Sequence, residues 1–224
     1  MSSRVVLSAA LVVAGLVVAC ESAERGSVER GAEAAVQGVV DAATDFHEEL
    51  ENVVQVAGRE LEALSLHVQE AGRSGREEVE AGLEAALEAA MRERARLDTL
   101  LAGLDPDEAL DPDVRDEVAR LDARVTGLLL QARVGREAFT TRARMSLADM
   151  ESEMRAMADR VDASERPEYE RLGRSLETVR SEVVTAGASG DSAFVLARPD
   201  LVERLTTLRG QVRRLGLDVQ ASGI

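Results

Sequence analysis

The side chains that could carry chemistry in this 224-residue chain are two histidines, a group of methionines and a run of aspartates. His47 and His67 are each followed, three or four residues later, by a glutamate, Glu51 or Glu70, so each could pair with a carboxylate on its own helix face. A zinc site needs three or four such ligands, and the Glu-x-x-His spacing of di-iron bundles is missing. We therefore interpret both histidines as surface or helix-pairing residues.

Four methionines are grouped in the second half of the sequence: Met145, Met150, Met154 and Met157. Thioether sulfurs at such spacing could hold Cu(I). The last three also continue an apolar seam at helical spacing, and methionine fills irregular cores well. We predict that these three are core residues and that the group holds no metal.

Five aspartates surround a double Asp-Pro turn: Asp105, Asp107, Asp111, Asp113 and Asp116. Hard cations such as calcium prefer carboxylate oxygens, but Leu110 stands where an EF-hand loop requires glycine. Asp105 and Asp111 each precede a proline, which is the sequence of a helix N-cap followed by the first helical residue. We predict helix caps here rather than a calcium site.

The composition argues against catalysis and against nucleic-acid binding. All 27 basic residues are arginine, so no lysine can form a Schiff base. No phosphate-binding glycine loop or nucleophilic serine motif is found in the sequence. The 42 acidic residues give a net charge of -15, and there is no basic patch to bind phosphates. We expect a protein that is not an enzyme, needs no cofactor and binds no nucleic acid.

The N-terminal residues are typical of an export signal. One positive charge, Arg4, precedes a short apolar run from Val5 to Ala19, which is too short and wrongly flanked for a stable membrane span. Directly after this run stands Cys20, the only cysteine, which therefore has no partner for a disulfide within the chain. Cys20 thus calls for a different chemical role.

The stretch from Leu16 to Cys20 resembles the lipobox of bacterial lipoproteins, in which small or aliphatic residues precede a cysteine that is diacylated and becomes the new N-terminus. The resemblance implies a signal peptide over 1–19, lipid attachment at Cys20 and a short tether over 20–26. It also implies anchoring in a bacterial envelope through palmitate-type chains, facing the periplasm, with Glu21 favouring the outer over the inner membrane. The alternative is that Cys20 only ends an ordinary signal or an uncleaved anchor helix.

The remainder, residues 27–224, follows a heptad pattern. Apolar residues recur at alternating steps of three and four, first through Val36, Val39, Ala43, Phe46, Leu50, Val53, Ala57, Leu61, Leu64 and Val68. The pattern predicts helices over about 27–71, 75–103, 112–163, 166–186 and 199–219, with a flexible stretch over 187–198. No strand-like alternation is found. We predict an all-α fold, an elongated antiparallel helical bundle or coiled coil of about five helices.

The predicted bundle contains two breaks in its heptad pattern and several glycines within its helices. The breaks at Gly72–Gly75 and Ser164–Pro167 fit either kinks or chain reversals. Glycines within the predicted helices lower helix stability, so they predict close backbone approach or local bending. They are Gly31, Gly38, Gly58, Gly82, Gly127 and Gly135.

Acidic heptad helices on a lipid anchor suggest a structural or protein-interaction module, an adaptor or a spacer. Such a module would contact a protein partner, or a second copy of itself, through its helix faces. The alternative is a helical carrier that binds a lipid or a metal. Murein lipoproteins of enteric bacteria are also lipidated heptad proteins, but they are joined to peptidoglycan through a lysine. Because this chain has no lysine, we expect no such covalent link.

Overall fold

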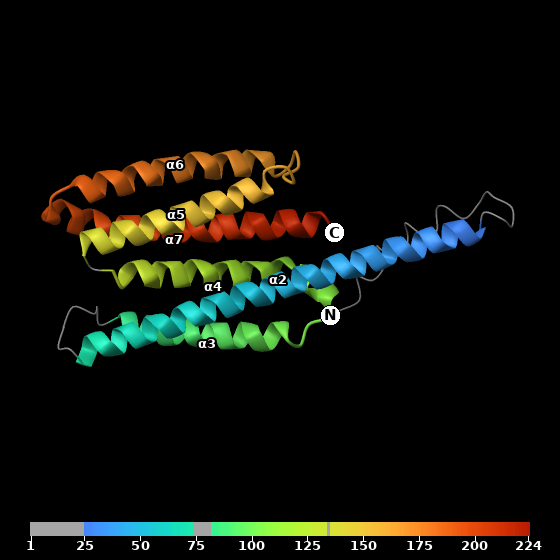
Figure 1. Ribbon diagram of the computed structural model, residues 1–224, viewed down its shortest axis with the longest axis horizontal. Helices are drawn as coiled ribbons and strands as arrows, with labels where there is room; N and C mark the ends of the chain where they lie inside the picture. The colour runs from blue at the N-terminus through green and yellow to red at the C-terminus, as the bar shows by residue number, and fades with distance from the viewer. Residues whose placement is uncertain (1–24, 74–81, 134) are drawn as a thin grey trace. The chain divides into compact units, whose positions relative to one another are not determined.

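The computed structural model describes residues 25–73, 82–133 and 135–224, and every element within them is a helix. Figure 1 shows them in chain order. They are α2 (Arg25–Arg73), α3 (Leu83–Leu101), the short 3-10 helix η2 (Pro106–Leu110), α4 (Pro112–Gln131), α5 (Arg136–Met157), α6 (Arg166–Ala188) and α7 (Asp191–Ser222). The chain divides into two units, Met1–Asp41 and Ala42–Ile224, and the packing described below lies within the second. The predicted all-α helical bundle is confirmed.

Ion pairs between helices fix the direction in which neighbours run. Arg115 of α4 pairs with Asp218 of α7 at 3.0 Å, and further along α4, Asp122 pairs with Arg213 at 2.9 Å. Residue numbers rise on α4 as they fall on α7, so the two helices are antiparallel. The same order relates α3 to α4 through the pairs Glu93–Arg124 and Arg96–Glu117.

Both sequence breaks that were left open are chain reversals. α2 and α3 run in opposite directions in Figure 1, although residues 74–81 between them lie outside the described part. α5 and α6 are also antiparallel in that view, and Arg180 of α6 reaches back to pair with Glu151 near the middle of α5. The helices on either side of each break are therefore antiparallel and do not form one kinked helix.

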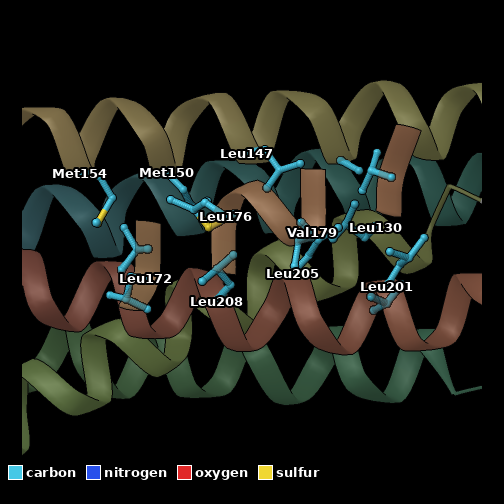
Figure 2. Close-up of a cluster of buried hydrophobic side chains, with 14 of the residues drawn as sticks. Leu130, Leu147, Met150, Met154, Leu172, Leu176, Val179, Leu201, Leu205 and Leu208 are labelled. Atoms are coloured by element: carbon cyan, nitrogen blue, oxygen red, sulfur yellow. The ribbon is translucent and has the colours of Figure 1, made fainter. Parts of the chain in front are cut away.

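Two hydrophobic cores hold the second unit together. One lies among α2, α3 and α4 and includes Leu50, Leu61, Leu97 and Leu121. The other lies among α5, α6 and α7, and Figure 2 shows its leucines and methionines interleaved. Each fully buried leucine contributes about 1.5–3 kcal/mol. The cores meet at the α4–α7 contact, where Leu130 of α4 joins the second core and Leu217 of α7 joins the first.

The single helix predicted over 112–163 is wrong, because the structure has two antiparallel helices there, α4 and α5. The backbone of Gly135 is extended, with φ −71° and ψ 138°, and forms the N-cap of α5. The C-terminal end of α4 is bound by a residue that is distant in sequence. The Arg198 guanidinium of α7 donates a hydrogen bond to the Gln131 carbonyl oxygen. The apolar seam continues across the break in the sequence, so periodicity alone did not reveal it.

The flexible stretch predicted over 187–198 is also wrong. α6 extends to Ala188, and α7 begins at Asp191, eight residues before the predicted start, with Pro199 inside the helix. A proline within a helix removes one hydrogen bond. The early turns are held by Phe194, which is buried and packs edge-on against Phe139 of α5, with ring centroids 5.5 Å apart. The contact between Phe194 and Phe139 therefore stabilises helical turns that Pro199 alone would disfavour.

At two of the glycines a side chain of another helix occupies the space that a Cβ would need. A Cβ added to Gly58 would lie 2.9 Å from Arg94, and one added to Gly127 would lie 2.7 Å from the Thr206 hydroxyl. Gly38, Gly82 and Gly135 have nothing within 4 Å, and the last two are N-cap residues. Gly127 thus leaves space on α4 for the Thr206 side chain of α7.

Alanine substitutions at two glycines should have opposite effects. We expect Gly173→Ala to stabilise the protein by about 0.5–1 kcal/mol, because it lies in open space within α6 and alanine is the better helix former. We expect Gly127→Ala to destabilise it by about 1 kcal/mol, because overpacking against Thr206 exceeds the same helix gain. Urea unfolding measures both, and equal stabilisation would show that α4 and α7 separate without cost.

A capping interaction at the start of the α5–α6 turn has a pH-dependent consequence. The Asp162 carboxylate accepts hydrogen bonds from the Ser164 hydroxyl and from the backbone N–H groups of Ser164 and Glu165, at 2.8, 2.6 and 3.0 Å. These bonds favour the ionised form and hold the pKa of Asp162 below its ordinary value. Its stabilising contribution is therefore present above the unfolded-state pKa and is lost as the pH falls through the folded-state pKa.

We expect Asp162→Ala to reduce stability at neutral pH and to leave stability less sensitive to acid below about pH 4, the ordinary aspartate range. Asp159→Ala, which removes an exposed aspartate nearby, serves as the control. Thermal unfolding of both variants between pH 2 and pH 7 measures the effect. Parallel pH profiles for the two variants would contradict the capping role of Asp162.

Candidate functional site

The predicted lipid-attachment residue, Cys20, and the predicted signal peptide over 1–19 lie outside the described residues. Both stay predictions. The predicted tether over 20–26 is described only in its last two residues, Arg25 and Gly26, which already belong to α2. None of the described helices combines the length and apolar character needed to cross a membrane.

The two histidines lie apart on α2. His47 is partly buried, and its Nε2 lies 3.5 Å from the Glu51 carboxylate, which confirms the predicted pairing. His67 is exposed and forms no ion pair with Glu70 among the described residues. Within residues 25–73, 82–133 and 135–224, no three histidine, cysteine or acidic side chains are placed to hold a metal ion.

The predicted core positions of three methionines and the predicted helix caps at Asp105 and Asp111 are confirmed. Met150, Met154 and Met157 are buried in the core of α5, α6 and α7, whereas Met145 is exposed. Asp105 forms a capping box with Glu108 at the start of η2, and the Asp111 carboxylate accepts from the Asp113 backbone N–H at 2.8 Å at the start of α4. These residues have structural roles.

The most unusual polar feature is a ring of four charged side chains. It is formed by Arg209 and Arg213, one turn apart on α7, with Asp122 of α4 and Glu153 of α5. Asp122 Oδ2 lies 2.7 Å from Arg209 Nε and 2.9 Å from Arg213 Nε. Glu153 Oε1 lies 2.8 Å from a terminal nitrogen of each arginine. Each guanidinium therefore binds both carboxylates, and the ring joins three helices.

The ring keeps its charges although it is largely removed from water. Arg209 is only 8% exposed. Burial by itself would lower the pKa of Arg209, but the charges and hydrogen bonds of Asp122 and Glu153 outweigh burial and raise it. Arg209 is thus a buried cation whose cost of desolvation is offset by two carboxylates.

The ring lies in a polar groove of about 380 Å³, lined by α2, α4, α5 and α7. Glu60 of α2 pairs across it with Arg142 of α5 at 2.9 Å. The remaining lining is mostly polar: Glu49, Asn52, Val53, Val56, Thr126, Ser146, Asp149 and Ser152. This groove is the candidate binding site of the second unit.

Sequence reasoning missed this groove because its residues come from four helices. One signal was present in the sequence. Arg209 and Arg213 directly follow the seam residues Leu208 and Val212, so they flank a buried stripe at helical spacing. Arginine beside a seam is equally compatible with a solvated position, and only the packed helices distinguish the two.

A second feature is an exposed apolar stripe in the first unit. Val36 and Val39 of α2 lie on the predicted heptad seam, yet they are 58% and 47% exposed, and the neighbouring Val40 is exposed as well. From Ala43 onward the same seam is buried. The seam is therefore covered by neighbouring helices only from Ala43 onward.

A third exposed apolar group lies at the start of α7, where Leu196 is 80% exposed beside Val195.

Comparisons with models of protein families, with curated proteins and with solved structures found no match for this chain.

Proposed function

We propose that this protein is a lipid-anchored lipoprotein of the bacterial cell envelope whose helical bundle acts as a non-enzymatic interaction module, an adaptor or spacer. Cys20 would be the acylated residue, held at the periplasmic face of a membrane, with the outer membrane favoured over the inner. The bundle would contact a protein partner or a second copy through a helix face.

The observation that carries this proposal is the exposed stripe of Val36, Val39 and Val40. Heptad positions of a helix become apolar because they pack against another helix. Exposed apolar side chains at consecutive heptad positions therefore favour a partner helix. The stripe lies close in sequence to Cys20, which would place the contact near the membrane.

The packing of the second unit favours an interaction module over a carrier. Its apolar side chains form two cores in which most seam residues are under 5% exposed. A bundle that opens around a lipid would have to expose these side chains, at about 25 cal/mol per Å² of apolar surface. No specific observation favours the metal-carrier alternative.

Site-specific photocrosslinking in cells tests the interaction. A photoreactive residue at position 36 or 39 of the full chain is expected to capture one defined protein, or a second copy, in repeated experiments. Asp41, also on α2 but turned away from the stripe, is the control position. Equal capture at position 41, or capture of lipid alone at 36 and 39, would overturn the proposal.

Metabolic labelling with an alkyne fatty acid tests the anchor separately. We expect label on the full chain and none on Cys20→Ser, with the variant moving from the membrane fraction to the soluble fraction. Loss of two or three acyl chains removes the membrane affinity, since each buried CH₂ contributes about 0.8 kcal/mol. Equal labelling of Cys20→Ser would exclude Cys20 as the acylated residue.

A further inference from the structure

We propose that the polar groove between α2 and α5 binds a linear aliphatic amine, a diamine or polyamine cation. This inference is independent of the proposed function, because it concerns a small ligand in the second unit. It rests on the unpaired charge in the groove, on the order of the side chains along it and on two hydroxyl groups that line it.

The charges lining the groove do not balance. Five carboxylates face three guanidinium groups. Asp122 and Glu153 are bound by Arg209 and Arg213, and Glu60 is bound by Arg142. The two carboxylates left, Glu49 and Asp149, form no ion pair or hydrogen bond within the described residues. The groove therefore attracts a cation with two positive centres.

The two carboxylates without an ion pair, Glu49 and Asp149, both lie away from the end of the groove that the Glu60–Arg142 pair occupies. α2 and α5 run in opposite directions (Figure 1), and the Glu60–Arg142 pair marks one end. At 1.5 Å per residue, Asp149 lies about 10 Å along α5 from Arg142, and Glu49 lies about 16 Å along α2 from Glu60. Both carboxylates therefore lie away from the closed end, at different depths along the groove.

Apolar side chains occupy the wall between these polar positions. Val53 and Val56 of α2 line the groove between Glu49 and Glu60. Methylene groups of an aliphatic amine would pack on these valines while the ammonium groups reach the carboxylates. A chain molecule with charges at its ends matches this alternation better than a compact ion.

Two hydroxyl groups that line the groove are further hydrogen-bond acceptors for a ligand. Thr126 of α4 is 7% exposed and Ser146 of α5 is 6% exposed, and both line the groove. Neither hydroxyl forms a hydrogen bond with another described residue. Thr140, which is also buried on α5, instead donates to the carbonyl oxygen of Arg136 at 2.9 Å. Neither the Thr126 nor the Ser146 oxygen is among the buried atoms that lack a partner, so both remain accessible from the groove and can accept hydrogen bonds from an ammonium group.

Other ligand classes fit the groove less well. Within the described residues no three acidic or histidine side chains converge on one point, as a metal ion requires. An anion would meet a lining with more carboxylates than guanidinium groups, and Arg209 and Arg213 are already occupied by two carboxylates each. A linear amine can bind the separated carboxylates Glu49 and Asp149, which neither a single metal ion nor an anion would bind.

Isothermal titration of the purified protein with putrescine and spermidine tests the proposal. We expect saturable binding of both amines and a rise in melting temperature with amine concentration. Glu49→Gln and Asp149→Asn should each weaken binding about tenfold, the effect of losing one charge-assisted hydrogen bond. Ser146→Ala should weaken it by a smaller factor and leave the fold intact, as circular dichroism would show.

The control is Glu48→Gln, which removes the same charge from an exposed position on α2 outside the groove lining. It should leave the affinity within about twofold. An equal loss in Glu48→Gln and Glu49→Gln would reduce the effect to general attraction by an acidic protein and overturn the site. Absence of saturable binding by either free amine would also overturn it, and would leave the acceptors to a lysine or arginine side chain of a protein.

Discussion

Replacing Arg209 with alanine is expected to lower the free energy of unfolding by about 3–5 kcal/mol. The substitution removes a guanidinium that is 8% exposed and leaves Asp122 and Glu153 with half of their cationic partners. Arg213 still binds both carboxylates, but their desolvation remains in full while half of the attraction that offset it is lost. The packed stem of the arginine adds to the loss.

The matched control is Arg204→Ala on the same helix. Arg204 pairs with Glu182 of α6, but its side chain is about half exposed, so solvent screens the pair. We expect a loss of at most about 1 kcal/mol. Urea unfolding at neutral pH compares the two variants. Equal losses at positions 204 and 209 would show that the charged ring is solvated in solution.

A fourfold replacement separates stability from structural specificity. Arg209→Met and Arg213→Met, combined with Asp122→Leu and Glu153→Met, remove all charges of the ring together. We expect this variant to be far closer to the parent stability than Arg209→Ala alone, because a buried ion network adds little over a well-packed apolar cluster. If the charged ring contributes to amine binding in the groove, the fourfold variant should also bind putrescine and spermidine more weakly.

The ring therefore explains more about the shape of the groove than about net stability. Because each carboxylate binds both guanidinium groups, we expect the ring to contribute to the register of α4, α5 and α7. The groove and its unpaired carboxylates are thus positioned by interactions that do little to stabilise the fold.

Features set by local sequence could be predicted before the fold was known. The caps at Asp105 and Asp111 depend on residues within one turn, and the burial of Met150, Met154 and Met157 follows from the helical period. The two errors in the helix boundaries have a different origin. The α4–α5 turn is held by Arg198 from α7, and the early start of α7 is held by Phe139 from α5.

The charged groove was beyond prediction for the same reason. Each of its members is an ordinary polar residue on its own helix, and its character arises when Asp122, Glu153 and Arg209 meet from three helices. The exposed stripe around Val36 is the opposite case. The sequence predicted its apolar character correctly, but no local signal distinguishes a seam that is covered within the chain from one that is exposed.

Replacing Phe139 with alanine is the other substitution with a large expected effect, a loss of about 3–5 kcal/mol in the free energy of unfolding. Phe139 is completely buried, and its ring contacts the Phe194 ring edge-on at an interplanar angle of 65°. Both residues stand at the same place in their helices, four residues after an N-cap glycine. The pair therefore holds the first turns of α5 and α7 against each other.

The variant should also have a local effect that distinguishes this contact from any other cavity. Residues 191–198 precede Pro199, which interrupts the hydrogen bonds of α7, so these turns depend on Phe194 for their order. We expect hydrogen exchange in Phe139→Ala to speed up most over residues 191–198, and Met145→Ala, an exposed position on α5, to change neither exchange nor stability appreciably. If exchange over 191–198 rises no more than in the rest of α7, the early turns are held by the helix itself, and the account of why α7 begins before its proline fails.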